Sequence, residues 1–130
     1  MTRSTFLTIA SGIAVSVGIF AMIFPSVLLE SKGVEAINGT LIWTRETGLL
    51  LLTIGIIAFF IRKHENSETL KIFFLGNIII QIGLFLIELA AYFNEVITKL
   101  SGIIPNLSLH VLLTIGFIYF YVDMKLKNAK

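Results

Sequence analysis

The sequence contains no cysteine, which excludes disulfides, thiolate metal sites and cysteine nucleophiles. Charge is also scarce, because only 14% of the 130 residues are Asp, Glu, Lys or Arg, whereas 56% are hydrophobic. A soluble domain of this length cannot bury so much apolar surface in one core. We therefore expect most of the chain to lie in lipid. The few basic residues do not form the kind of patch that binds nucleic acid, so no nucleic-acid partner is expected.

Apolar runs long enough to cross a bilayer as helices occur four times. A crossing needs about 20 mostly apolar residues. The runs cover residues 6–24, 41–61, 72–92 and 107–122. They predict one transmembrane domain over residues 1–130, an all-α integral membrane four-helix bundle. Its helices are expected at about 5–24, 41–62, 70–100 and 107–124.

The segments between these runs have loop chemistry. Residues 25–40 carry charges and Gly33, and residues 62–68 form a short polar turn. Gly102 and Pro105 are expected to separate the last two helices, since glycine ends helices and proline cannot continue the hydrogen-bond ladder. The first run is too long for a signal peptide and no cleavage site follows it, so a retained helix is predicted.

Lysine and arginine on short loops indicate which side of a membrane each loop faces. The N-terminus, the 62–71 turn and the C-terminus carry seven basic residues, and the opposite side carries three. The seven are Arg3, Arg62, Lys63, Lys71, Lys125, Lys127 and Lys130; the three are Lys32, Arg45 and Lys99. Both termini are therefore predicted to be cytoplasmic (N-in/C-in), in a plasma membrane or bacterial inner membrane.

Glycine pairs mark the expected packing faces, because small residues let helices approach closely in lipid. Gly48 and Gly55 share one face of the second predicted helix, and Gly76 and Gly83 share one face of the third. Gly12 belongs to a stripe of small residues on the first helix. We interpret all of them as helix–helix contacts.

Ionisable residues inside a membrane are costly and mark candidate functional sites. Four of them, Arg45, Glu46, Glu88 and His110, lie about one turn inside the outer ends of their helices. Because successive helices alternate in direction, these side chains are expected at a similar depth in the outer leaflet. They predict a polar pocket enclosed by the second, third and fourth helices.

Further polar and aromatic residues extend this predicted pocket. At about 100° per residue, Asn77, Gln81, Glu88 and Tyr92 fall on one face of the third helix. On the fourth helix, Thr114 shares a face with His110. Trp43 and Tyr92 are expected at its rim. Candidate ligand-binding residues are Arg45, Trp43, Gln81, Asn77, Tyr92 and Thr114. The alternative, in which these side chains are interfacial anchors and interhelical hydrogen bonds, stays open.

General acid–base work is the chemistry that this residue set supplies best. Glu88, His110 and Glu46 are the candidate catalytic residues, and Arg45 could hold an anionic group. A haem held by two histidines is excluded, because His110 is the sole histidine in a predicted membrane helix. The paired Glu-x-x-His pattern of di-iron bundles is absent, and no metal or cofactor is expected.

One short motif carries a family resemblance. Residues 43–48 read Trp-Thr-Arg-Glu-Thr-Gly, an Arg-Glu-x-Gly turn that opens the second helix after an outward loop. This motif and the four-helix layout resemble the DoxX-like superfamily of small membrane proteins. Some members of that superfamily are subunits of membrane oxidoreductases that use quinone. The resemblance implies a role for Arg45, Glu46 and Gly48 only.

Three functions remain open at this stage. The first is a pocket for a lipid-like or small amphipathic ligand, such as a quinone or an isoprenoid, with acid–base chemistry as a further option. The second is a non-catalytic subunit or scaffold, with a membrane-protein partner or a homo-oligomer. The third is a small proton-coupled transporter, although small multidrug transporters use a glutamate in the first helix, and this first helix has no acidic residue.

Overall fold

The computed structural model describes residues 1–127 and is all-α. It has five helices over these residues: α1 (Arg3–Ile23), α2 (Pro25–Lys32), α3 (Asn38–Ile61), α4 (Glu68–Phe93) and α5 (Leu100–Lys127). Four of them, α1, α3, α4 and α5, are long and apolar enough to cross a membrane. The predicted set of four apolar spans is confirmed at this level. Lys130 lies outside the described residues.

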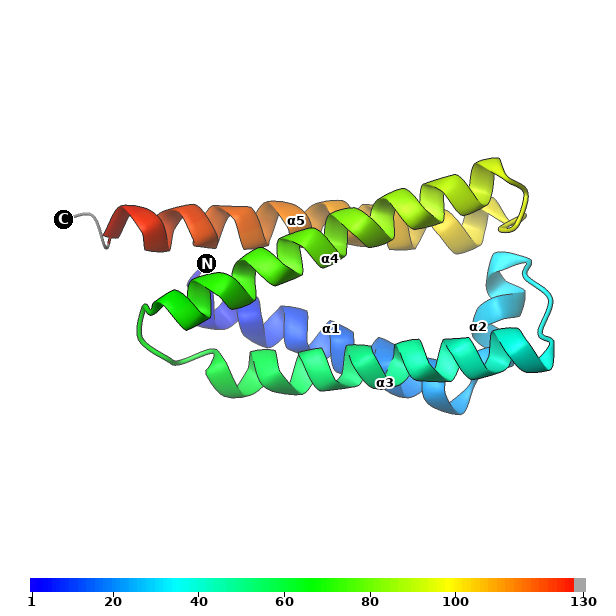
Figure 1. The fold of residues 1–130 in the computed structure, drawn as a ribbon, viewed down its shortest axis with the longest axis horizontal. Coiled ribbons are helices and arrows are strands. Elements are labelled where there is room, and N and C mark those ends of the chain that lie inside the picture. The colour runs from blue at the N-terminus through cyan, green and yellow to red at the C-terminus, as the bar shows by residue number, and fades with distance from the viewer. Residues whose placement is uncertain (128–130) are drawn as a thin grey trace.

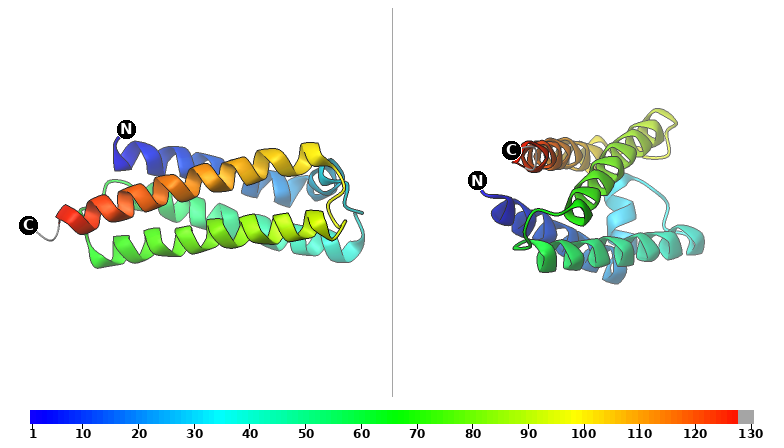
Figure 2. Two further views of the ribbon diagram at one scale, coloured as in Figure 1. Left: turned by 90° about the horizontal axis from the view of Figure 1, so that it is seen from above. Right: turned by 60° about the vertical axis from the view of Figure 1, so that its left-hand side comes forward.

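The long helices form two pairs (Figure 1). α1 packs along α3, and α4 packs along α5. The start of α1, the α3–α4 turn and the end of α5 lie at one end of the molecule, here called the basic end. α2 and the α4–α5 turn lie at the other end, and the two pairs diverge towards it (Figure 2).

Glycines hold α1 and α3 together. A Cβ atom added at Gly48 would lie 2.8 Å from the carbonyl oxygen of Gly18, and one at Gly55 would lie 2.9 Å from the nitrogen of Val15. The backbones are therefore in direct contact, as predicted for Gly48 and Gly55. Gly12, Gly76 and Gly83 do not mark contacts between helices of this chain, because a Cβ atom added at any of them meets nothing within 4 Å.

An apolar cluster joins the two pairs at the basic end. Its buried members come from α1, α3, α4 and α5: Phe6, Leu7, Ala10, Ala58, Leu70, Phe74, Phe117, Phe120 and Met124. The Phe6 ring lies 5.0 Å from that of Phe117, edge to face, and 5.3 Å from that of Phe120. Such aromatic contacts add to the stabilisation from burial alone.

The short helix α2 was not predicted, since residues 25–40 looked like a loop. Pro25 occupies its first turn, where the missing N–H costs nothing, and Gly33 ends it with a left-handed φ of 73°. Both signals were present in the sequence. The helix has only eight residues, too few for periodicity to reveal it.

The predicted end of the third helix at residue 100 is also wrong. α4 ends at Phe93, and Glu95 takes a left-handed φ of 59°. The N–H of Val96 then turns back to the carbonyl of Ala91 at 2.9 Å and closes the helix. A glycine usually marks this conformation, and here a glutamate adopts it.

The predicted start of the last helix at residue 107 is wrong for a different reason. α5 begins at Leu100 and contains Pro105. Pro105 lies inside the helix, where it removes one hydrogen bond of the ladder because it has no backbone N–H. Packing offsets that loss, because Ile103 is buried and Gly102 lies against the backbone of α2, where a Cβ atom would be 2.4 Å from the Ser31 carbonyl oxygen.

Candidate functional site

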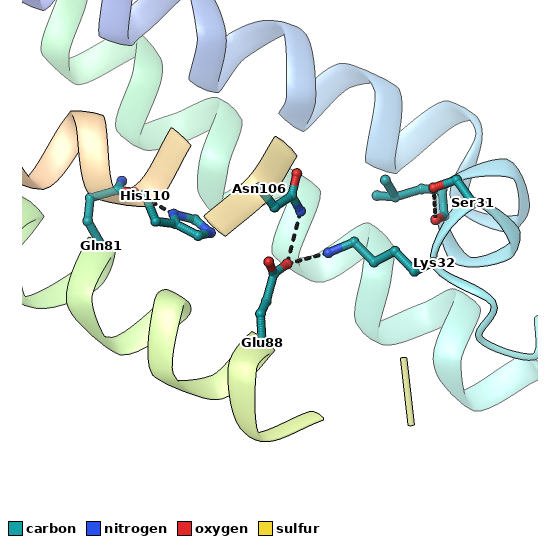
Figure 3. A network of polar contacts seen from close by, with 7 residues as sticks. Ser31, Lys32, Gln81, Glu88, Asn106 and His110 are labelled. Atoms are coloured by element: carbon teal, nitrogen blue, oxygen red, sulfur yellow. Dashed lines mark hydrogen bonds and ion pairs between the residues drawn. The ribbon is translucent and has the colours of Figure 1, made fainter. Parts of the chain in front are cut away.

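A ladder of paired side chains lies between α4 and α5. Nearest the α2 end, the Asn106 amide donates a hydrogen bond of 2.9 Å to Oε1 of Glu88. One step further in, Nδ1 of His110 lies 2.7 Å from Oε1 of Gln81 (Figure 3). Because α4 and α5 are antiparallel, the residue numbers of successive pairs fall along α4 and rise along α5. Each pair forms one rung of the ladder. Polar groups thus extend from the α2 end towards the middle of the pair.

A lysine from α2 completes the outer rung. The ammonium group of Lys32 donates to Oε1 of Glu88 and forms an ion pair with it (Figure 3). Both side chains are largely buried, with 15% and 14% of their surfaces exposed. The second carboxylate oxygen of Glu88, Oε2, is buried and has no hydrogen-bond partner among the described residues. One oxygen of this carboxylate is therefore fully used and the other is unpartnered.

The inner end of the ladder is closed by its own hydrogen bonds and then by aromatic rings. Asn77 is buried and donates to the carbonyl of Phe73 at 2.9 Å, and Thr114 donates to the carbonyl of His110 at 2.7 Å. The next contact towards the basic end is between the rings of Phe74 and Phe117, whose centroids lie 5.4 Å apart. Polar side chains thus give way to the apolar cluster.

The position of Lys32 depends on how α2 is held. Its carbonyl oxygen accepts hydrogen bonds from the backbone N–H groups of Thr98 and Lys99, each at 3.1 Å. The Thr98 hydroxyl donates to the Gly33 carbonyl at 3.1 Å, and the Lys99 ammonium donates to the Glu30 carbonyl at 2.8 Å. The end of α2 is therefore tied to the α4–α5 turn, which keeps the Lys32 ammonium over Glu88.

Arg45, Glu46 and Trp43 do not join this ladder. They lie on α3 and are exposed, Trp43 to 70%. Within residues 1–127, no three His, Cys, Asp or Glu side chains come together, so Glu46 does not meet Glu88 and His110. The predicted depth of a residue in the membrane does not tell which way its side chain faces. α3 packs against α1 rather than against the α4–α5 pair. Tyr92 is half-buried on α4, one turn beyond Glu88.

Two residues of the site escaped sequence reasoning. Lys32 was assigned to an outer loop, and only the unrecognised helix α2 brings it inward. Asn106 is not among the predicted site residues, although it precedes His110 by four residues and so shares its helix face. That spacing was the signal that could have identified it.

The ladder has definite hydrogen-bond polarity. Oε1 of Gln81 can only accept a hydrogen bond, so Nδ1 of His110 carries the proton in this arrangement. A neutral imidazole then has its basic lone pair on Nε2. Glu88 and His110 therefore lie on two rungs of the same seam between α4 and α5, with different partners.

The family model of a domain of unknown function, DUF8292, matches residues 1–122. The chain belongs to this family. The DUF8292 match includes every residue of the ladder as well as Lys32. No curated protein and no solved structure matches the chain. The resemblance to the DoxX-like superfamily stays a prediction.

Proposed function

We propose that this member of the DUF8292 family is an integral membrane protein that binds the polar head of an amphipathic molecule at Glu88. The buried Oε2 atom of Glu88, without a hydrogen-bond partner in the described chain, supports this proposal most directly. Buried acceptors are nearly always satisfied, and a hydroxyl or amine group of a ligand would satisfy this one. A long-chain alcohol or a quinol is therefore the expected ligand class.

The orientation belongs to the same proposal. The basic end carries Arg3, Arg62, Lys63 and Lys71. By the positive-inside rule, we expect both chain termini on the cytoplasmic side of a bacterial inner membrane or another plasma membrane. The Glu88 end would face outward. A ligand would thus reach Glu88 from the outer leaflet.

His110 adds acid–base chemistry to the proposal as a second step. Its Nε2 atom could accept a proton from a ligand hydroxyl, while Glu88 holds the ligand in place. The aromatic cluster beneath Asn77 favours a binding site over a transport pathway, because the polar ladder ends against Phe74 and Phe117.

The test measures which lipid-like molecules co-purify with the full chain after gentle solubilisation. Native mass spectrometry of the parent protein should detect a bound amphipath, and Glu88→Gln should lose it. Glu88→Gln also leaves the Lys32 ammonium without an ionic partner. A Lys32→Glu/Glu88→Lys variant, which restores an ion pair, is therefore compared with it. This exchange variant should fold and still lack the ligand. Glu95→Gln, at an exposed site beyond the end of α4, is the matched control and should retain the ligand.

Two outcomes contradict the proposal. In the first, the Lys32→Glu/Glu88→Lys variant retains every molecule that the parent binds, so that the ion pair is purely structural. In the second, the parent carries no amphipath and binds neither an added long-chain alcohol nor an added quinol.

A second candidate, a subunit of a membrane complex, is favoured by a different face of α4. Gly76 and Gly83 lie seven residues apart on this face and have open space above them. Gly76→Leu and Gly83→Leu should leave the isolated chain folded, since a Cβ atom at either position meets no other atom within 4 Å. If a partner helix or a second copy docks here, both variants should abolish its co-purification. Unchanged co-purification would contradict this candidate.

A further inference from the structure

A basic pocket opens at the end of the molecule opposite Glu88. Its volume is about 530 Å³, and it lies between the start of α1, the α3–α4 turn and the end of α5. The residues that give it charge are Arg3, Arg62, Lys63 and Asp123. Asp123 already interacts with another group. With three basic residues and one acidic residue, the lining of the pocket carries a net positive charge.

The basic side chains of this pocket are fixed to different degrees. The guanidinium of Arg3 donates to Oδ1 of Asn66 and to the carbonyl of His64, while its Nε atom is buried without a partner in the described chain. The Arg62 guanidinium lies 3.6 Å from the centre of the Phe59 ring. Lys63 is exposed. The start of α1 adds the positive end of a helix dipole to the same place.

An apolar groove lies further along the same helices. Its volume is about 350 Å³, and α1 and α3 line it with Thr8, Ser11, Gly12, Val15, Ile56, Phe59 and Phe60. Ser4 lines the pocket and Thr8 lines the groove, one turn apart on the same face of α1. Phe59 and Phe60 of the groove lie near the end of α3, and Arg62 and Lys63 of the pocket follow them after Ile61.

The two hollows together match the shape of a lipid. At 1.5 Å per residue, the groove extends from about 6 to 17 Å beyond Ser4, so that its far end reaches about the middle of a ~30 Å hydrocarbon core. The pocket supplies positive charge at the membrane surface, where a lipid phosphate lies. We propose that an anionic phospholipid of the leaflet at the basic end binds here, with its phosphate in the pocket and an acyl chain in the groove.

The first arm of the test compares two lipids with identical acyl chains, phosphatidylglycerol and phosphatidylcholine. Native mass spectrometry and thermal unfolding of the full chain in detergent report binding. The parent should prefer phosphatidylglycerol. Lys63→Gln should lower the affinity for phosphatidylglycerol about fivefold, which is the effect of one surface charge on lipid affinity. Lys125→Gln removes an exposed charge outside the pocket and should change nothing.

The second arm separates a lipid from a soluble phosphate. Gly12→Leu places a side chain in the groove, where its Cβ atom meets nothing within 4 Å. This variant should lose phosphatidylglycerol and bind glycerol phosphate as the parent does. Equal binding of both lipids by the parent, or equal losses in Lys63→Gln and Lys125→Gln, would overturn the proposal. So would glycerol phosphate that stabilises the protein as much as phosphatidylglycerol, with Gly12→Leu unaffected.

Discussion

The ion pair of Lys32 and Glu88 fixes the positions of these two side chains more than it stabilises the fold. Taking two charges out of water costs several kcal/mol for each, and their attraction returns little more than that cost. Removing one partner is a different matter, since the remaining charge stays buried and unpaired. The pair therefore contributes little net stability while making each residue depend on the other.

This dependence predicts a strongly non-additive double-mutant cycle. Glu88→Leu alone should lower the free energy of unfolding by about 3 kcal/mol, because Lys32 is left unpaired. Lys32→Met together with Glu88→Leu should recover most of that loss. Unfolding in mixed micelles measures all four proteins of the cycle. Additive losses would show that the two charges are not coupled.

At the scale of elements, the glycines divide into two groups that the sequence does not distinguish. Gly48→Ala should destabilise the protein by about 1 to 3 kcal/mol, because its Cβ atom would press on the Gly18 carbonyl at 2.8 Å. Gly76→Ala should be neutral, or stabilising by up to about 1 kcal/mol through helix propensity. Thermal unfolding of the two variants side by side tests this contrast, and equal effects would contradict it.

Helix α2 is the element on which the site depends most. Gly33→Ala places a Cβ atom at a φ of 73° and 2.1 Å from the Thr98 hydroxyl. The α2 connection to the α4–α5 turn should therefore loosen. Hydrogen exchange at the amides of Thr98 and Lys99 should accelerate at least tenfold, while exchange within α1 and α3 stays unchanged. Ser31→Ala, on the same helix, is the control, and a similar acceleration there would argue against a specific role for Gly33.

The four long helices could be predicted from the sequence, but which of them pack together could not. The four spans were predictable because about 20 consecutive apolar residues have few alternatives to a membrane helix. Glu88, His110, Gln81 and Asn77 could be placed on inward faces from periodicity alone. The error over Arg45 has a physical cause, since depth follows from chain direction whereas facing depends on which helices pack together. Backbone contact through Gly48 pairs α3 with α1, and the sequence gives no sign of that choice.

At the scale of the whole molecule, the orientation can be tested directly because the parent chain has no cysteine. Single cysteines at Lys63 and Glu95 lie at opposite ends and at exposed sites. A membrane-impermeant maleimide applied to intact cells should label Glu95→Cys and should label Lys63→Cys only after permeabilisation. The reverse pattern would invert the topology and with it the leaflet assigned to each site.

The two-pair architecture also has a consequence for biogenesis. Lys32 and Glu88 are 56 residues apart, with Lys32 on α2 and Glu88 in the second helix pair. At ribosomal rates of 5–20 residues per second, the lysine waits about 3 to 11 seconds for its carboxylate. During that interval the first pair can already be packed through its glycines, while the Lys32 ammonium has no ionic partner. A chain that stops short of Glu88 would therefore leave the Lys32 ammonium without the carboxylate that it pairs with.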